Sequence, residues 1–163
     1  MRRKLEDIVD STALSATIRH RLAEVFADAS TYSPLTRAEL QRTMRTVLDF
    51  CIEQRPDAPD SDGQELVLAA ADVDSIGISN WLAHLPVDLD NNVVVIWLGD
   101  RSAATMAYRA FVQHYEELWY PGADDVWVYG EKDHWLLEID HEERFAFKRC
   151  STQRSEQVSG RRG

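Results

Sequence analysis

The chain of 163 residues has no lysine and no arginine between Pro56 and Asp100. This segment carries nine acids, namely Asp57, Asp60, Asp62, Glu65, Asp72, Asp74, Asp88, Asp90 and Asp100, which account for most of the formal net charge of −10. A field of one sign attracts basic partners and opposes binding to nucleic acid and anionic membranes. We therefore expect a basic protein partner, and neither nucleic acid nor a membrane.

Cysteine and long apolar runs are also scarce. Cys51 and Cys150 are the two cysteines, and neither belongs to a CxxC pair. Two distant cysteines do not make a disulfide framework, so we expect reduced thiols and a cytoplasmic location. The basic start of the chain is followed by Leu5-Glu6-Asp7 and not by an apolar run, so we expect no export signal. The longest apolar run, residues 93–98, is too short to span a bilayer.

Hydrophobic periodicity predicts two N-terminal helices. The first runs from Leu5 to about Phe26, with apolar side chains at steps of three and four residues. Ser11-Thr12 is a point at which this helix could be interrupted, because their side chains compete with the helical backbone for hydrogen bonds. The second begins near Thr36, which forms a capping-box pattern with Glu39, and ends at Pro56.

The rest of the sequence predicts strands around further helices. We expect a strand at 66–73, a short helix within 74–86 capped by Ser79, a strand at 93–98 and a long helix at 102–119. Strands at 126–130, 135–139 and 144–148 follow, joined by connections of hairpin length. The unit formed by 93–98, 102–119 and 126–130 would normally cross over into parallel pairing.

The predicted fold class is α+β. It has a mixed four- to five-stranded sheet with a C-terminal antiparallel meander, and two N-terminal helices and one long central helix pack on it. Residues 1–150 form a single domain in this prediction, and the polar residues 151–163 form a disordered tail.

Catalytic motifs are missing. Isolated glycines give no phosphate-binding loop, and no metal-ligand spacing is present, so we expect no cofactor. The densest polar cluster lies in the last forty residues of the predicted domain. An enzyme could use His141 as a general base oriented by Asp124, Asp125 or Asp140, or as a metal ligand with His134. The alternative is that these residues only stabilise hairpin turns.

Aromatic residues in the predicted strand at 126–130 leave two possibilities. If Val126 and Val128 face the core, Trp127 and Tyr129 face the other side of the sheet. That side is either an exposed surface with large anchors for a partner or is covered by a second layer.

Residues 111–128 and 135–147 together form one pattern. A helix ends at Trp119-Tyr120-Pro121 and is followed by the paired acids Asp124-Asp125 and a strand. A second strand that begins with Trp135 and the turn His141-Glu142-Glu143 complete the pattern. This pattern resembles that of small bacterial immunity proteins of polymorphic-toxin systems. The resemblance covers about a quarter of the chain. It implies a cytoplasmic protein that blocks a cognate toxin by binding it, without catalysis.

Three functional hypotheses follow. The first is an acidic protein-binding module, specifically an immunity protein or antitoxin, acting as a monomer or weak dimer. Its predicted contact residues are Asp60, Asp62, Asp74, Asp124, Asp125, Trp127, Glu131, Glu142 and Glu143. The second is a small hydrolase or metal-dependent enzyme that uses His141 with nearby carboxylates. The third is a regulatory or scaffold subunit of a bacterial assembly.

Overall fold

The computed structural model describes residues 12–53 and 64–149. Several predictions fall on residues outside these ranges: residues 5–11 of the first helix, the contact residues Asp60 and Asp62, the state of Cys150, and the tail. Residues 12–15 are described and are not helical, so the prediction of a helix through them was wrong. The helix begins only at Ala16, because the Ser15 side chain caps it by accepting the Ile18 N–H at 3.1 Å.

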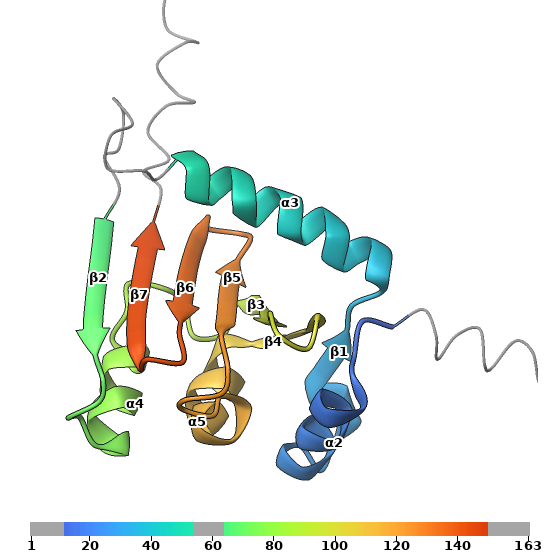
Figure 1. The fold of residues 1–163 in the computed structure, drawn as a ribbon, viewed down its shortest axis with the longest axis horizontal. Helices are drawn as coiled ribbons and strands as arrows, with labels where there is room; N and C mark the ends of the chain where they lie inside the picture. Colours follow the sequence, from blue (N-terminus) through green and yellow to red (C-terminus); the bar gives the residue numbers. More distant parts are fainter. Residues whose placement is uncertain (1–11, 54–63, 150–163) are drawn as a thin grey trace, which may run out of the picture.

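The described residues build a seven-stranded antiparallel sheet with helices on both faces (Figure 1). The strands are β1 (Tyr32–Pro34), β2 (Gln64–Ala69), β3 (Asn92–Trp97), β4 (Ser102–Ala107), β5 (Val126–Gly130), β6 (Trp135–Ile139) and β7 (Arg144–Arg149). The α-helices are α2 (Ala16–Val25), α3 (Arg37–Glu53), α4 (Ser75–Ala83) and α5 (Tyr108–Leu118), and a short 3₁₀-helix, Ala29–Thr31, precedes β1. The strand order is β1-β4-β3-β5-β6-β7-β2. The broad prediction of an α+β fold is confirmed.

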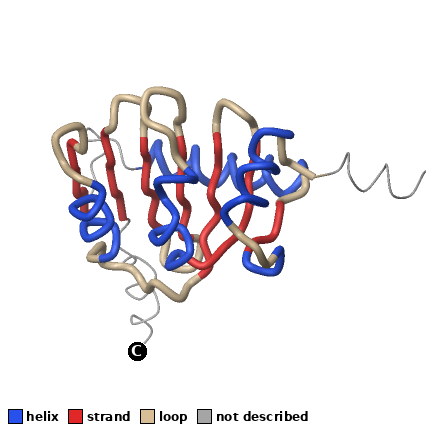
Figure 2. Tube along the Cα trace, turned by 90° about the horizontal axis from the view of Figure 1, so that it is seen from below, coloured by secondary structure: helices blue, strands red, loops and turns tan. Residues whose placement is uncertain are grey.

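The helices form two unequal layers. Helices α2, α4 and α5 cover one face of the sheet, and α3 alone crosses the other face (Figure 2). The larger core lies on the three-helix side, where Leu22, Leu82 and Phe111 pack against alternate residues of the strands. On the α3 side, Val47 and Phe50 pack against Tyr129 and Leu136. Because a single helix covers this second face only partly, cavities lie along its flanks.

Local capping explains where the helices begin. Thr36 Oγ1 accepts a hydrogen bond from the Glu39 N–H at 3.2 Å, so the predicted start of α3 is confirmed. The prediction for α4 was wrong in its cap. Asp74, and not Ser79, caps this helix, with its carboxylate accepting the Gly77 N–H at 2.7 Å. Ser79 lies inside the helix.

The prediction of a four- to five-stranded mixed sheet with a crossover was also wrong. Residues 102–107, expected to open a long helix, form β4, which pairs with β3 through a hairpin turn at Gly99-Asp100. The central helix is therefore only Tyr108–Leu118, and β3 pairs antiparallel with β5. Ala103 and Ala104 are fully enclosed between layers, so burial overrides the helical preference of alanine. The predicted C-terminal meander of β5, β6 and β7 is confirmed.

Within the described residues, no helix has both the length and the apolar composition needed to cross a membrane.

Candidate protein-binding site

Three loops that are distant in the sequence meet at one end of the sheet. Loop 70–74 follows β2, loop 119–125 joins α5 to β5, and loop 140–143 joins β6 to β7. The Ala70 N–H donates to the Glu143 carbonyl at 2.9 Å, and the Gly122 N–H donates to the His141 carbonyl at 3.0 Å. These backbone contacts hold the loops side by side, so their side chains share one surface.

Carboxylates dominate this surface, which we call the acidic edge. Its members are Asp72, Asp74, Glu116, Asp125, Glu142 and Glu143. They come from the three loops and from the last turn of α5, and four of them belong to the predicted contact set. Arg144 also lies at this end and is 3.9 Å from Glu65 of β2, and His141 adds a positive charge when it is protonated. Like charges gathered in this way repel one another, which costs folding stability.

A cavity of about 290 Å³ opens within the acidic edge. Its lining comes from loop 70–74, the start of α4, the end of α5 and the two neighbouring loops, namely Ala70, Ala71, Val73, Ser75, Ile78, Tyr115, Glu116, Trp119, Pro121 and Glu143. Trp119 is buried, and its indole N–H donates to the Asp124 carbonyl at 3.0 Å. The Tyr115 hydroxyl donates to the Ser75 carbonyl at 3.1 Å, and burial raises the pKa of Tyr115 to about 12. The cavity thus combines a neutral wall with the carboxylates of Glu116 and Glu143.

His141 and Asp125 form an exposed ion pair beside the cavity. The His141 Nδ1 lies 2.9 Å from Asp125 Oδ1, and the same oxygen accepts the His141 N–H at 3.0 Å. The hydrogen bond between the two side chains raises the pKa of His141 and lowers the pKa of Asp125. The side chains are 56% and 47% exposed, so water screens much of their attraction. His141 does not line the cavity described above.

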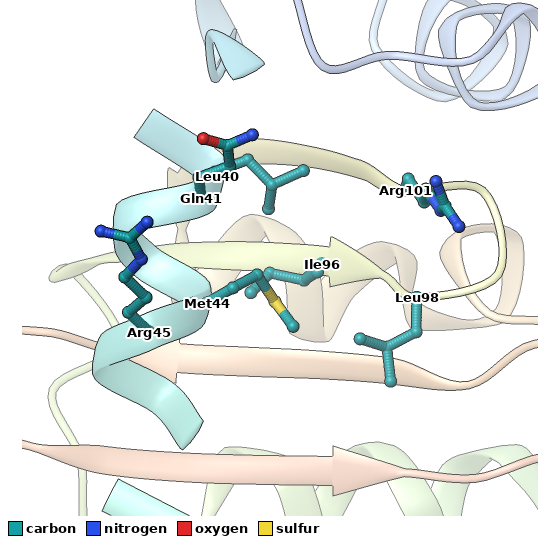
Figure 3. Close-up of a pocket in the computed structure, with 7 residues that line it drawn as sticks. All are labelled: Leu40, Gln41, Met44, Arg45, Ile96, Leu98 and Arg101. Atoms are coloured by element: carbon teal, nitrogen blue, oxygen red, sulfur yellow. The ribbon is translucent and has the colours of Figure 1, made fainter. Parts of the chain in front are cut away.

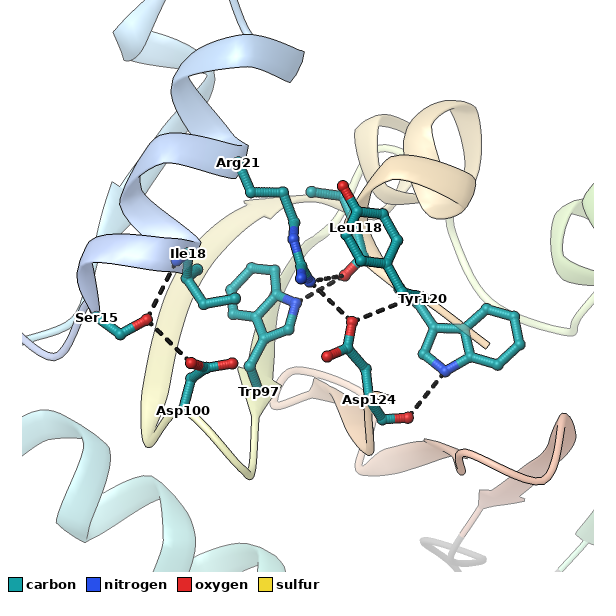
Figure 4. A network of polar contacts seen from close by, with 9 residues as sticks. Ser15, Ile18, Arg21, Trp97, Asp100, Leu118, Tyr120 and Asp124 are labelled. Atoms are coloured by element: carbon teal, nitrogen blue, oxygen red, sulfur yellow. Dashed lines mark hydrogen bonds and ion pairs between the residues drawn. The ribbon is translucent and has the colours of Figure 1, made fainter. Parts of the chain in front are cut away.

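The side chain of Asp124 is mostly buried, whereas that of its neighbour Asp125 is largely exposed. The Asp124 carboxylate lies 2.8 Å from the Arg21 guanidinium and accepts the Tyr120 N–H at 2.9 Å (Figure 4). The side chains of Arg21 and Asp124 are only 8% and 12% exposed. Arg21 also stacks 4.0 Å above the Tyr120 ring and, like the Trp97 indole, donates to the Leu118 carbonyl. The ion pair therefore ties α2 to loop 119–125.

The remaining predicted site residues either lie outside the acidic edge or form hydrogen bonds within a turn. The Asp140 carboxylate accepts the N–H groups of Glu142 and Arg144, at 2.9 and 3.0 Å, within the β6–β7 turn. Trp127 is half-buried on the α3 face, where Tyr129 is buried, so a second layer covers this face at least in part. Glu131 is at the opposite end of β5 from the acidic edge. Within the described ranges, no three His, Cys, Asp or Glu residues are arranged to hold a metal ion.

Two acids of the site were absent from the predicted contact set. Glu116 belongs to α5, and Asp72 precedes α4. A signal for Glu116 was present in the sequence, because Glu116-Glu117 lies just before the Pro121-Gly122 helix stop. Negative charge is unfavourable at the C-terminal end of a helix, so acids there suggest a role other than stability. For Asp72, only the contact between β2 and β7 brings its loop to this end.

Comparison of the chain with protein-family models, with curated proteins and with solved structures gave no match.

Proposed function

We propose that this chain is a protein-binding module, and specifically a bacterial immunity protein that neutralises a cognate basic toxin by direct binding in the cytoplasm. The observation that carries the proposal is the acidic edge, where carboxylates from four separate segments lie at one end of the sheet. Two of them, Glu116 and Glu143, line a cavity whose wall contains the buried Trp119. Such a clustering lowers stability, and a basic partner would reverse that cost. Complementary charge also accelerates association and rejects partners of the wrong sign.

The contact expected at the cavity is a lysine or arginine side chain of the toxin. Its aliphatic part would pack on Val73 and Trp119, and its charge would meet Glu116 and Glu143. The module would act as a monomer or weak dimer, without catalysis.

Co-expression of the full chain with the products of neighbouring genes tests the proposal. We expect one of these products to arrest growth, and the full chain to relieve the arrest and to co-purify with that product. The proposal fails if no neighbouring product forms a stable complex and none causes an arrest that the chain relieves.

Charge-neutral variants test whether the acidic edge makes the contact. The test variant carries Asp74→Asn, Glu116→Gln and Glu142→Gln, and the control variant carries Glu24→Gln, Asp49→Asn and Asp88→Asn. Both variants lose three charges, and asparagine at position 74 keeps the cap of α4. We expect the association rate at low salt to fall by about tenfold in the test variant and by less than about threefold in the control. Equal losses in both variants would show that the contact lies elsewhere.

A second candidate is a hydrolase in which Asp125 orients His141. The 2.9 Å contact at Nδ1 favours it, because it leaves Nε2 to exchange a proton with a substrate or water. Purified protein would then hydrolyse a small ester or phosphoester, and His141→Ala would abolish this activity. Equal rates for the wild type and His141→Ala would eliminate the enzyme hypothesis and leave binding as the function.

A further inference from the structure

A separate cavity lies on the α3 face of the sheet. It has a volume of about 300 Å³ and is lined by Leu40, Gln41, Met44, Arg45, Ile96, Leu98 and Arg101 (Figure 3). We call it the α3 groove. Its lining is mostly aliphatic, with Leu40 and Met44 from the helix facing Ile96 and Leu98 from the end of β3. A volume near 300 Å³ is at the lower end of the range for small-molecule sites.

Two arginines stand on either side of this apolar stretch. Figure 3 shows Arg45 on α3 and Arg101 on the β3–β4 turn. Arg21, Arg109 and Arg144 each have a carboxylate within 4.0 Å, whereas no described carboxylate forms an ion pair with Arg45 or Arg101. No acidic side chain lines the groove. In a chain of net charge −10, this pairing of free cations with an apolar surface is a local reversal of the overall charge.

The nearest acid in sequence does not neutralise Arg101. The Asp100 carboxylate instead accepts a hydrogen bond from the Ser15 hydroxyl at 3.3 Å, on the side of α2 (Figure 4). The Ser102 hydroxyl donates to the Asp100 carbonyl at 3.1 Å and accepts the Ser15 N–H at 2.7 Å. These contacts fix the turn from the side of α2.

The backbone of Arg101 is strained. Its φ is +48°, a left-handed conformation that favours glycine at the end of a hairpin turn. Retention of a long cationic side chain there costs stability. The turn therefore holds a guanidinium without a described ion-pair partner beside the α3 groove.

We propose that the α3 groove binds a small amphipathic anion, represented by a straight-chain carboxylate of about eight carbons. At roughly 30 Å³ for each water-sized group, the cavity accommodates about ten heavy atoms. The hydrocarbon chain lies on Leu40, Met44, Ile96 and Leu98, and the carboxylate accepts charge-assisted hydrogen bonds from the guanidinium of Arg45 or Arg101. A small anion meets less repulsion from the acidic remainder of the chain than an acidic protein would.

Titration of the full chain with sodium octanoate, followed by ¹H–¹⁵N NMR, tests this proposal. We expect shifts at the amides of Leu40, Met44, Ile96 and Leu98 and a dissociation constant of about 1 mM or lower. The neutral analogue 1-octanol should bind at least about tenfold more weakly, because it lacks the charge that the arginines recognise. No shifts at millimolar octanoate, shifts confined to other surfaces, or equal affinity for octanol would overturn the proposal. Shifts at these amides that depend on protein concentration alone would also overturn it, by showing that a second copy occupies the groove.

Variants separate recognition of charge from folding. At least one of the variants Arg45→Gln and Arg101→Gly should weaken octanoate binding at least fivefold, and neither should change octanol binding. Arg101→Gly also relieves the strained φ, so the loss of affinity should accompany a more stable fold, which a purely structural role of Arg101 would not produce. Arg42→Gln is the matched control, because Arg42 lines a different cavity together with Thr105 and Glu131. An equal loss in the Arg42 variant, or no loss in the other two, would refute the assignment.

Discussion

Arg21 and Asp124 are both almost fully enclosed, and each depends on the other for compensation of its charge. The Asp124 carboxylate has two hydrogen-bonding partners, Arg21 and the Tyr120 N–H. Removal of one partner from a buried ion pair is costly because the remaining charge stays desolvated. The pair is therefore a structural tie beneath the acidic edge.

Arg21→Met tests this tie. Methionine preserves much of the packing but leaves Asp124 without its cation, so we expect the free energy of unfolding to fall by about 3 kcal/mol. Urea denaturation followed by tryptophan fluorescence measures the change. Arg19→Met is the control, since Arg19 is exposed, and its effect should stay within about 0.5 kcal/mol. A loss below about 1 kcal/mol for Arg21→Met would mean that water already solvates Asp124.

The pair of His141 and Asp125 gives a prediction for pH. Because the hydrogen bond to Asp125 raises the pKa of His141 above 6.5, the imidazole signal should titrate with a midpoint above that value. Asp125→Asn removes the charge and should bring the midpoint back toward 6.5, whereas Asp88→Asn should not. Proton NMR of the imidazole measures both midpoints. A midpoint at 6.5 or below in the wild type would contradict the ion pair.

The sign of the stability effect follows from these two shifts. Raising the pKa of His141 stabilises the fold at pH values below 6.5, and this contribution is lost as the pH rises through the higher folded value. Lowering the pKa of Asp125 stabilises the fold above pH 3.8, and this contribution is lost as the pH falls through the lower folded value. The pair therefore contributes most between pH 3.8 and 6.5. Because both groups are exposed, the effect on stability is small.

Among the hairpins, β5–β6 is closed by an unusually tight contact. Gly130 pairs with Trp135, and the Trp135 indole lies directly against the Gly130 backbone, where a Cβ atom would overlap the ring. Trp135 is itself buried against Tyr108 and Phe147, so the ring has little room to move. Glycine at this position is required by packing and not by a left-handed φ.

Gly130→Ala should therefore destabilise the fold by about 2–3 kcal/mol, the range expected when a core is overpacked. Gly99→Ala is a matched control, because a Cβ atom at Gly99 would meet nothing within 4 Å. That variant should change the free energy of unfolding by less than about 0.5 kcal/mol. Thermal and urea unfolding of the two variants make the comparison. Similar stabilities for both would show that Trp135 can adopt another rotamer.

Strand β4, which the sequence analysis predicted as the start of a helix, shows that local sequence does not always determine secondary structure. Ser102–Ala107 contains three alanines and a methionine, which favour helices, and its pairing with β3 makes it a strand. The Gly99-Asp100 turn was the available signal for a hairpin, but it equally permits a helix cap. By contrast, β5, β6 and β7 alternate clearly and have short connections, so local pattern was sufficient there.

The candidate site was predictable only in part. Asp74, Asp125, Glu142 and Glu143 could be chosen as exposed loop acids, but nothing local indicated that their loops meet. That meeting depends on β2 pairing with β7 across a sequence separation of about eighty residues. Asp124 could not be distinguished from Asp125, because its partner Arg21 lies 103 positions away.

Within the described residues, the acidic edge and the α3 groove differ in the charge of the side chains that line them. The acidic edge lies at one end of the sheet, whereas the α3 groove is lined by Arg45 and Arg101 and by no acidic side chain. The proposed basic partner would be attracted to the acidic edge, and the proposed small anion to the α3 groove. The two proposed sites can therefore be tested independently.

The same separation predicts how salt affects stability. With a net charge of −10 and carboxylates gathered at one end, repulsion within the folded chain should exceed that in the unfolded chain, where the charges are farther apart. Raising NaCl from 10 to 150 mM shortens the screening length from about 30 to about 8 Å. We expect the free energy of unfolding to rise by on the order of 1 kcal/mol, as measured by urea denaturation at constant pH. The variant with Asp74→Asn, Glu116→Gln and Glu142→Gln should show a smaller rise than the variant with Glu24→Gln, Asp49→Asn and Asp88→Asn. Equal rises in the two variants would show that the repulsion comes from the overall charge and not from the acidic edge. A free energy of unfolding that falls with added salt would mean that surface ion pairs such as Arg109–Asp90 outweigh the repulsion.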